Sequence, residues 1–157
     1  MSEQFTHLNE KNEVHMIDVT SKPNVSRFAA ARGRIYLRER TLKAISQGTV
    51  IKGNVLTTAQ IAGTLAVKQT WALIPMCHPL SIGSVEISFN QTDKYIEVNC
   101  SVNTYGKTGI EMEALTGVSV ALLTIWDMVK SSEKDENGQY PVTKIDNIHV
   151  VEKIKGE

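Results

Sequence analysis

The sequence is poor in cysteine and proline and has no excess of glycine. Its two cysteines, Cys77 and Cys100, are too few for the disulfide framework of a small secreted protein. Only four prolines and ten glycines occur among 157 residues, which excludes collagen-like and proline-rich low-complexity structure. The first 13 residues are polar and carry three glutamates, so they do not resemble a secretory signal. We therefore expect a reducing, cytoplasmic location.

The sequence also lacks an excess of charge of either sign. Lysine and arginine together number 17, as do aspartate and glutamate, so no overall field favours nucleic acid or an anionic membrane. Residues 114–126 form the longest nearly uncharged stretch, which is shorter than the roughly 20 residues of a membrane-spanning helix. This stretch indicates a buried helix. An anionic substrate would need a locally basic pocket.

Periodicity predicts a mixed order of strands and helices over one domain, residues 1–157, with residues 1–14 as a flexible arm and some strand character at 15–20. Thr57 or Thr58 is expected to cap the N-terminus of the helix predicted at 59–73, and Gly48 to end the helix predicted at 41–47. Glu133 and the residues up to Gly138 are expected to form a charged turn. The expected elements are a strand at 31–40, helices at 41–47 and 59–73, a hairpin of strands 84–90 and 95–102, a helix at 110–130 and an edge strand at 142–151.

Helices that alternate with antiparallel strands predict an α+β fold. The expected arrangement is ferredoxin-like: an antiparallel sheet with two main helices packed on one face.

All five arginines lie between Arg27 and Arg40, and most share one parity of the predicted strand. This pattern favours a solvated sheet face, with a phosphate-facing surface as the alternative. Gly106-Lys107-Thr108 precedes a helix but does not form a phosphate-binding loop of the known pattern, because position 101 is serine where that pattern needs glycine. The helix that begins near Gly109 still offers free backbone N–H groups and a positive dipole end to an anion.

Cys77 and His78 lie side by side between Pro75 and Pro79, which stiffen the loop. Three interpretations are open: a zinc site, a histidine that carries protons or donates to a substrate, or a structural cysteine beside a surface histidine. Zinc is disfavoured because Cys100 and His149 are isolated in the sequence and no Cys-x-x-Cys or His-x-x-x-His pair occurs. The residues alone favour the structural interpretation.

The long helix carries Glu111, Glu113, Asp127 and Lys130 around an apolar middle. Lys130 follows Asp127 by three residues and can contact it, which is typical of a surface ion pair and also possible in an acid–base cluster. Lys52, which precedes Gly53, and Lys68 are weaker candidates for ligand contact.

Several longer stretches together resemble one family. They are 15–19 (HMIDV), 52–55 (KGNV), 58–63 (TAQIAG), 66–71 (AVKQTW), 73–80 (LIPMCHPL), 106–116 (GKTGIEMEALT) and 123–130 (LTIWDMVK). Over residues 7 to 140 the chain resembles the cyclic pyranopterin monophosphate synthases, the molybdenum cofactor biosynthesis C (MoaC) proteins.

This resemblance implies an enzyme that converts a GTP-derived 3′,8-cyclo-7,8-dihydroguanosine 5′-triphosphate into cyclic pyranopterin monophosphate and releases pyrophosphate. It implies general acid–base chemistry without a redox step, and we expect no cofactor and no metal-ligating residue; whether a divalent metal accompanies the triphosphate stays open. It also implies a ferredoxin-like fold and a homohexamer, a trimer of dimers, with active sites at subunit interfaces. Nucleic acid and membrane partners are not expected.

The family's functional residues transfer by matching position. The resemblance implies catalytic roles for Asp127, Lys52 and Lys130. It implies substrate binding by the following residues: Met76, Cys77, His78, Glu111, Met112, Glu113 and Lys68.

The C-terminus departs from the family pattern. Many members end in a Lys-Ser-Gly-Gly-Lys-Ser-Gly-like tail that contributes to an anion pocket, whereas this chain ends in residues 148–155, IHVVEKIK. Lys144, Lys153 and Lys155 are the candidates to supply the missing charge, and the sequence does not choose among them. Two other functions stay open at this point: a non-catalytic, oligomeric nucleotide-binding protein, and a zinc hydrolase that uses Cys77 and His78.

Overall fold

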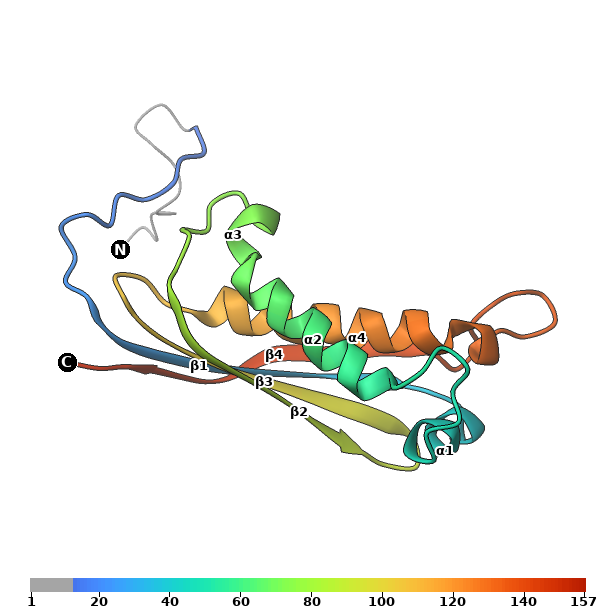
Figure 1. The fold of residues 1–157 in the computed structure, drawn as a ribbon. Helices are drawn as coiled ribbons and strands as arrows, with labels where there is room; N and C mark the ends of the chain where they lie inside the picture. The colour runs from blue at the N-terminus through green and yellow to red at the C-terminus, as the bar shows by residue number, and fades with distance from the viewer. Residues whose placement is uncertain (1–12) are drawn as a thin grey trace.

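The computed structural model describes residues 13–157 and contains one antiparallel four-stranded sheet in the order β2-β3-β1-β4. Helices α2 and α4 lie together over one face of the sheet (Figure 1). The α+β prediction is confirmed, and the order of strands and main helices matches a ferredoxin-like arrangement. The predicted arm at 1–14 falls almost entirely outside the described residues. The elements are β1 (Val25–Tyr36), α1 (Glu39–Ser46), α2 (Val55–Lys68), α3 (Thr70–Leu73), β2 (Ile82–Gln91), β3 (Tyr95–Gly106), α4 (Glu111–Glu133) and β4 (Lys144–Lys155).

Strand β1 begins six residues before the predicted start and ends four residues before the predicted end. Its early part, VSRFAA, shows no strict alternation of apolar and polar residues but pairs with both β3 and β4 from Arg27 onward. Small side chains such as Ala29 and Ala31 are fully buried there, beneath the helices. Helix α1 already begins at Glu39, so the last predicted strand residues belong to a loop and a helix.

Helix α2 begins earlier than predicted and is capped by a different residue. The Asn54 side chain accepts a hydrogen bond from the Thr57 backbone N–H at 3.0 Å, so the predicted caps Thr57 and Thr58 lie inside the helix. The predicted continuous helix also breaks after Lys68, and the short α3 follows. At 15–20 no strand forms; the Asp18 carboxylate instead accepts the Thr20 backbone N–H at 2.8 Å in a tight turn.

The prediction that the charged turn begins at Glu133 is wrong. It is the last residue of α4, and its side chain is fully buried. The carboxylate accepts hydrogen bonds from the hydroxyls of Thr41 and Thr143 and from the backbone N–H of Arg38. These bonds satisfy the buried charge and connect the end of α4 to the start of α1 and to the residue before β4.

Helices α2 and α4 approach each other closely in the core. A Cβ atom added to Gly63 would lie 2.9 Å from the backbone oxygen of Gly117 and 2.6 Å from Cδ1 of Ile87. A Cβ atom at Gly117 would lie 2.7 Å from Val67 and 2.8 Å from the Cys100 sulfur. The two helices therefore pack with backbone against backbone at this point. By length and composition α4 could cross a membrane; here one face of its apolar middle, with Val118, Leu122 and Ile125, is buried in this core.

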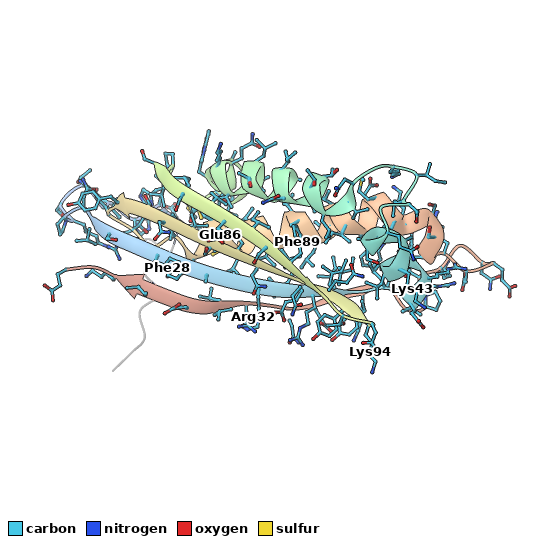
Figure 2. All side chains as sticks on the ribbon, turned by 60° about the horizontal axis from the view of Figure 1, so that its bottom comes forward. Phe28, Arg32, Lys43, Glu86, Phe89 and Lys94 are labelled. Atoms are coloured by element: carbon cyan, nitrogen blue, oxygen red, sulfur yellow. The ribbon has the colours of Figure 1, made fainter. Side chains whose placement is uncertain are left out.

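Among residues 13–157, no helix covers the opposite face of the sheet. Figure 2 shows this side, with Phe28 and Arg32 of β1 and Glu86 of β2 among the labelled side chains. Arg34 of β1 donates to the Glu97 carboxylate at 2.8 Å and lies over the Tyr95 ring at 4.7 Å. The predicted polar sheet face is therefore present, and β4 occupies one edge of the sheet, as predicted.

We expect Gly63→Ala to lower the free energy of unfolding by about 1 kcal/mol or more, although alanine favours helix. The added methyl group would meet the Gly117 carbonyl, which cannot move without displacing α4. Chemical denaturation at a fixed protein concentration measures the change. Thr57→Ala, at an exposed position of the same helix, is the control and should stay within about 0.5 kcal/mol of the wild type. Stabilisation by Gly63→Ala would contradict the packing argument.

Candidate functional site

The predicted site residues fall into two groups at opposite ends of α4. Glu111, Met112 and Glu113 lie in its first turn, whereas Asp127 and Lys130 lie near its end. Glu113 and Asp127 are separated by about four helical turns, or about 21 Å along the axis. One chain therefore does not bring all the predicted residues to one place.

At the C-terminal end of α4, three residues form a group that we call the lysine–aspartate cluster: Lys52, Asp127 and Lys130. The Lys130 ammonium donates to Asp127 Oδ1 at 2.7 Å. The Lys52 ammonium donates to Oδ2 at 3.1 Å and to the Asp127 backbone oxygen at 2.8 Å. Lys52 comes from the loop between α1 and α2, where Gly53 adopts a positive φ of 101° that suits glycine.

The hydrogen bonds of the lysine–aspartate cluster favour the charged forms of Asp127 and Lys130. The hydrogen bond from Lys130, then that from Lys52, lowers the pKa of Asp127 below its ordinary value. The same bond to Asp127 raises the pKa of Lys130. At neutral pH the cluster is thus one carboxylate between two ammonium groups. It carries a net positive charge and is open to solvent, with Asp127 59% exposed.

At the N-terminal end of α4, a cavity of about 330 Å³ contains most of the predicted substrate-binding residues. We call it the histidine–glutamate cavity. Its lining includes six of the seven: Met76, Cys77, His78, Glu111, Met112 and Glu113. The seventh, Lys68, lies exposed at the end of α2 and lines neither this cavity nor the basic cavity described below.

His78 is oriented by the segment that precedes β1. Its Nε2 atom lies 2.9 Å from the backbone oxygen of Ile17, and because a carbonyl only accepts, Nε2 carries the proton. In the neutral ring, Nδ1 is then the acceptor. Cys77 and Cys100 are both unpaired thiols, and burial, followed by the nearby Glu113 charge, raises the pKa of Cys77.

The two glutamates of this cavity differ in their electrostatics. Glu113 is only 4% exposed, and its burial raises its pKa. Burial also acts to raise the pKa of Glu111, but the hydrogen bond from Lys153, with the charges of Lys153 and Arg27, outweighs it and the net pKa is lowered. Because its pKa is raised, Glu113 is better suited than Glu111 to bind and release a proton.

A second cavity, of about 400 Å³, adjoins the first and is basic. It shares Lys22, Thr108 and Gly109 with the histidine–glutamate cavity, and the rest of its lining is Pro23, Val25, Arg27, Lys107 and Lys155. Sequence reasoning noted Arg27 and Lys107 separately and did not select Lys22. No periodic signal joins these residues, because they come from three different segments that the fold brings together.

The described residues do not offer an evident metal site. Within residues 13–157, no group of three or more histidine, cysteine, aspartate and glutamate side chains is arranged to hold an ion. The alternative of a zinc hydrolase therefore lacks a third ligand beside Cys77 and His78 in this part of the chain.

Comparison with known proteins identifies the family of this chain. The model of the MoaC family matches residues 16–156, which include both ends of α4. The chain belongs to the MoaC family.

Similar MoaC-family proteins are named probable cyclic pyranopterin monophosphate synthases. The protein from Methanocorpusculum labreanum is 77% identical over 97% of this chain and 96% of its own length. The protein from Methanoregula boonei is 60% identical over 98% of this chain and 99% of its own length. That from Pyrococcus horikoshii is 60% identical over 96% and 94%.

We expect Lys130→Ala to raise the pKa of Asp127 towards its ordinary value, because the hydrogen bond from Lys130 contributes most to lowering it. In the wild type, Asp127 should stay ionised as the pH falls through the range where a free aspartate protonates. Carboxyl-detected NMR titration measures both curves. Lys43→Ala, which breaks the exposed pair with Glu39 on α1, is the control and should leave the Asp127 curve unchanged. Identical curves for the wild type and Lys130→Ala would show that this ion pair does not form in solution.

Proposed function

We propose that this protein is a cyclic pyranopterin monophosphate synthase of molybdenum cofactor biosynthesis. It converts 3′,8-cyclo-7,8-dihydroguanosine 5′-triphosphate into cyclic pyranopterin monophosphate and releases pyrophosphate. The family match over residues 16–156 and the names of relatives at 57–77% identity support this proposal. The single structural observation that carries it is that the family's matching residues form two ordered polar groups, one at each end of α4.

The active site in this proposal combines two chains. A substrate that must contact both the lysine–aspartate cluster and the histidine–glutamate cavity cannot do so within one chain, where the two are about 21 Å apart along α4. A symmetric pair of chains can place the C-terminal end of one α4 beside the N-terminal end of the other. We propose a cytoplasmic homohexamer, a trimer of such dimers.

Exposed apolar side chains support an oligomer. Large apolar residues on the outer surfaces of α2, α3 and α4 are half exposed or more, which is unusual for a surface that stays in water. They are Ile61, Leu65, Trp71, Leu73 and Leu123.

The electrostatics suggest a division of roles. Asp127 has a lowered pKa and is a poor proton acceptor at neutral pH, so its role here is to hold the Lys52 and Lys130 ammonium groups in place. Fixed ammonium groups stabilise negative charge that develops on phosphate or on a ring oxygen. Glu113, whose pKa is raised by burial, and His78 are positioned to transfer protons during ring opening and closure.

We expect Asp127→Asn and Lys52→Ala to reduce product formation by roughly 100-fold or more while the fold and assembly are kept. Asp127→Asn removes the carboxylate that holds the two ammonium groups in place, and Lys52→Ala removes one of those ammonium groups. The assay supplies the cyclised GTP intermediate and detects the pterin product and pyrophosphate by mass spectrometry.

The matched controls are Glu39→Gln and Lys43→Ala, which alter another exposed ion pair on α1 and should turn over normally. No product from the folded wild-type protein would refute the proposed function. Normal turnover by both cluster variants would refute the assigned roles.

We also expect the protein to sediment as an oligomer, because each complete site requires two chains. Analytical ultracentrifugation at micromolar concentration, with activity measured on the same sample, tests this expectation. An active monomer would contradict the two-chain site.

A further inference from the structure

The loop that follows α4, residues 134–143, lies at the same end of the molecule as the lysine–aspartate cluster (Figure 1). The buried carboxylate of Glu133 closes the base of this loop, because it accepts a hydrogen bond from the hydroxyl of Thr143. Within the loop, Asp135 Oδ1 accepts the backbone N–H of Gln139 at 2.8 Å, and the Asp135 N–H donates to the Gln139 oxygen at 2.9 Å. These bonds define the conformation of the loop up to its next residue.

That next residue is Tyr140, which packs against α4. Its ring meets the Trp126 ring edge to face, with 5.4 Å between the centroids and 72° between the planes. Trp126 immediately precedes Asp127 in the lysine–aspartate cluster. Lys130 follows Trp126 by four residues, so these two side chains lie one turn apart on the same face of the helix. Tyr140 therefore lies beside the helix surface that carries Lys130.

The electrostatics of Lys130 agree with this placement. The hydrogen bond to Asp127 is the main cause of the raised pKa of Lys130, and the phenol of Tyr140 is close enough to shift that pKa in the same direction. Within residues 13–157, the Tyr140 hydroxyl forms no hydrogen bond. A phenol O–H can both donate and accept, so this group has its full hydrogen-bonding capacity left for a ligand.

The two ammonium groups of the cluster also keep part of their hydrogen-bonding capacity. An ammonium group has three N–H donors. Lys52 directs two of them to the Asp127 carboxylate and backbone oxygens, and Lys130 directs one to the carboxylate. An anionic ligand oxygen at this end of α4 thus meets N–H donors that Asp127 does not use, with the O–H of Tyr140 beside them.

We propose that Tyr140 is a further substrate-binding residue, whose phenol O–H donates a hydrogen bond to the oxygen that the Lys130 ammonium binds. The chemical class of the ligand, a purine-derived triphosphate, rests on the proposed function. The O–H adds a directional donor to the cluster without adding charge, and a donor to an anionic oxygen forms a strong hydrogen bond. Trp126 acts through Tyr140 and is a positioning residue.

The test is Tyr140→Phe, which keeps the ring against Trp126 and removes only the hydroxyl. Calorimetry measures the binding of GTP to the intact oligomer, and mass spectrometry measures turnover of the cyclised GTP intermediate by the same sample. We expect GTP to bind roughly tenfold more weakly and KM to rise by a similar factor, as for the loss of a hydrogen bond to a charged group. We expect kcat to change by less than about threefold, because the contact is already made in the bound ground state.

Tyr95→Phe is the matched control. Tyr95 also lies in an aromatic pair, 5.4 Å from the Tyr36 ring, and beside a cation, Arg34, but on the opposite face of the sheet. This variant should bind GTP and turn over like the wild type. A purely structural role for Tyr140 predicts no change in Tyr140→Phe either, because phenylalanine packs in the same way.

The proposed contact is overturned if Tyr140→Phe binds GTP and turns over like the wild type, or if Tyr95→Phe shows an equal loss. It is also overturned if Tyr140→Phe no longer sediments as the wild-type oligomer, which would indicate a role in assembly. The two proposals fail separately. Normal wild-type turnover with an unchanged KM in Tyr140→Phe refutes only the Tyr140 contact. Wild-type GTP binding that depends on the Tyr140 hydroxyl, without turnover, refutes only the proposed reaction, and a wild type that neither binds GTP nor turns over refutes both.

Discussion

The contact between α2 and α4 at Gly63 and Gly117 fixes the geometry on which the rest of the site depends. Because no side chain separates the two backbones there, α4 lies close against α2 and the sheet along its buried middle (Figure 1). The helix is then a rigid spacer whose two ends are set by the core. Glu133 secures one end through Thr41 and Thr143. The other end opens the histidine–glutamate cavity, and the distance between the ends is the reason for proposing a site built from two chains.

The two ends of α4 shift the pKa of a carboxyl group in opposite directions. At the exposed end, two ammonium groups lower the pKa of Asp127 and keep it charged. At the buried end, loss of water raises the pKa of Glu113 and favours its neutral form. A site that combines both ends has a fixed cationic group for anionic oxygen and a separate carboxyl group for proton transfer. Lys153 adds positive charge to the histidine–glutamate cavity, and Lys155 adds it to the basic cavity that adjoins it.

The sequence predicted the fold class, the edge position of β4 and the contact between Asp127 and Lys130, because each depends on local periodicity or spacing. It predicted no element for the N-terminal half of β1, since alanine has little strand propensity and Ala29 is held in the sheet by burial. It also missed the burial of Glu133 and the convergence of Lys22, Arg27 and Lys155. Those features depend on contacts between residues far apart in the sequence, which no local pattern reveals.

Subunit complementation tests the two-chain site most directly. One chain carries Asp127→Asn and the other Glu113→Gln, each inactive alone, and the two are refolded together, with hybrid formation checked by native mass spectrometry. Half of randomly formed pairs are hybrids with one intact site of two, so we predict recovery of roughly one quarter of wild-type turnover. Hybrids that turn over no faster than the separate variants would contradict an active site built from both ends of α4 in two different chains.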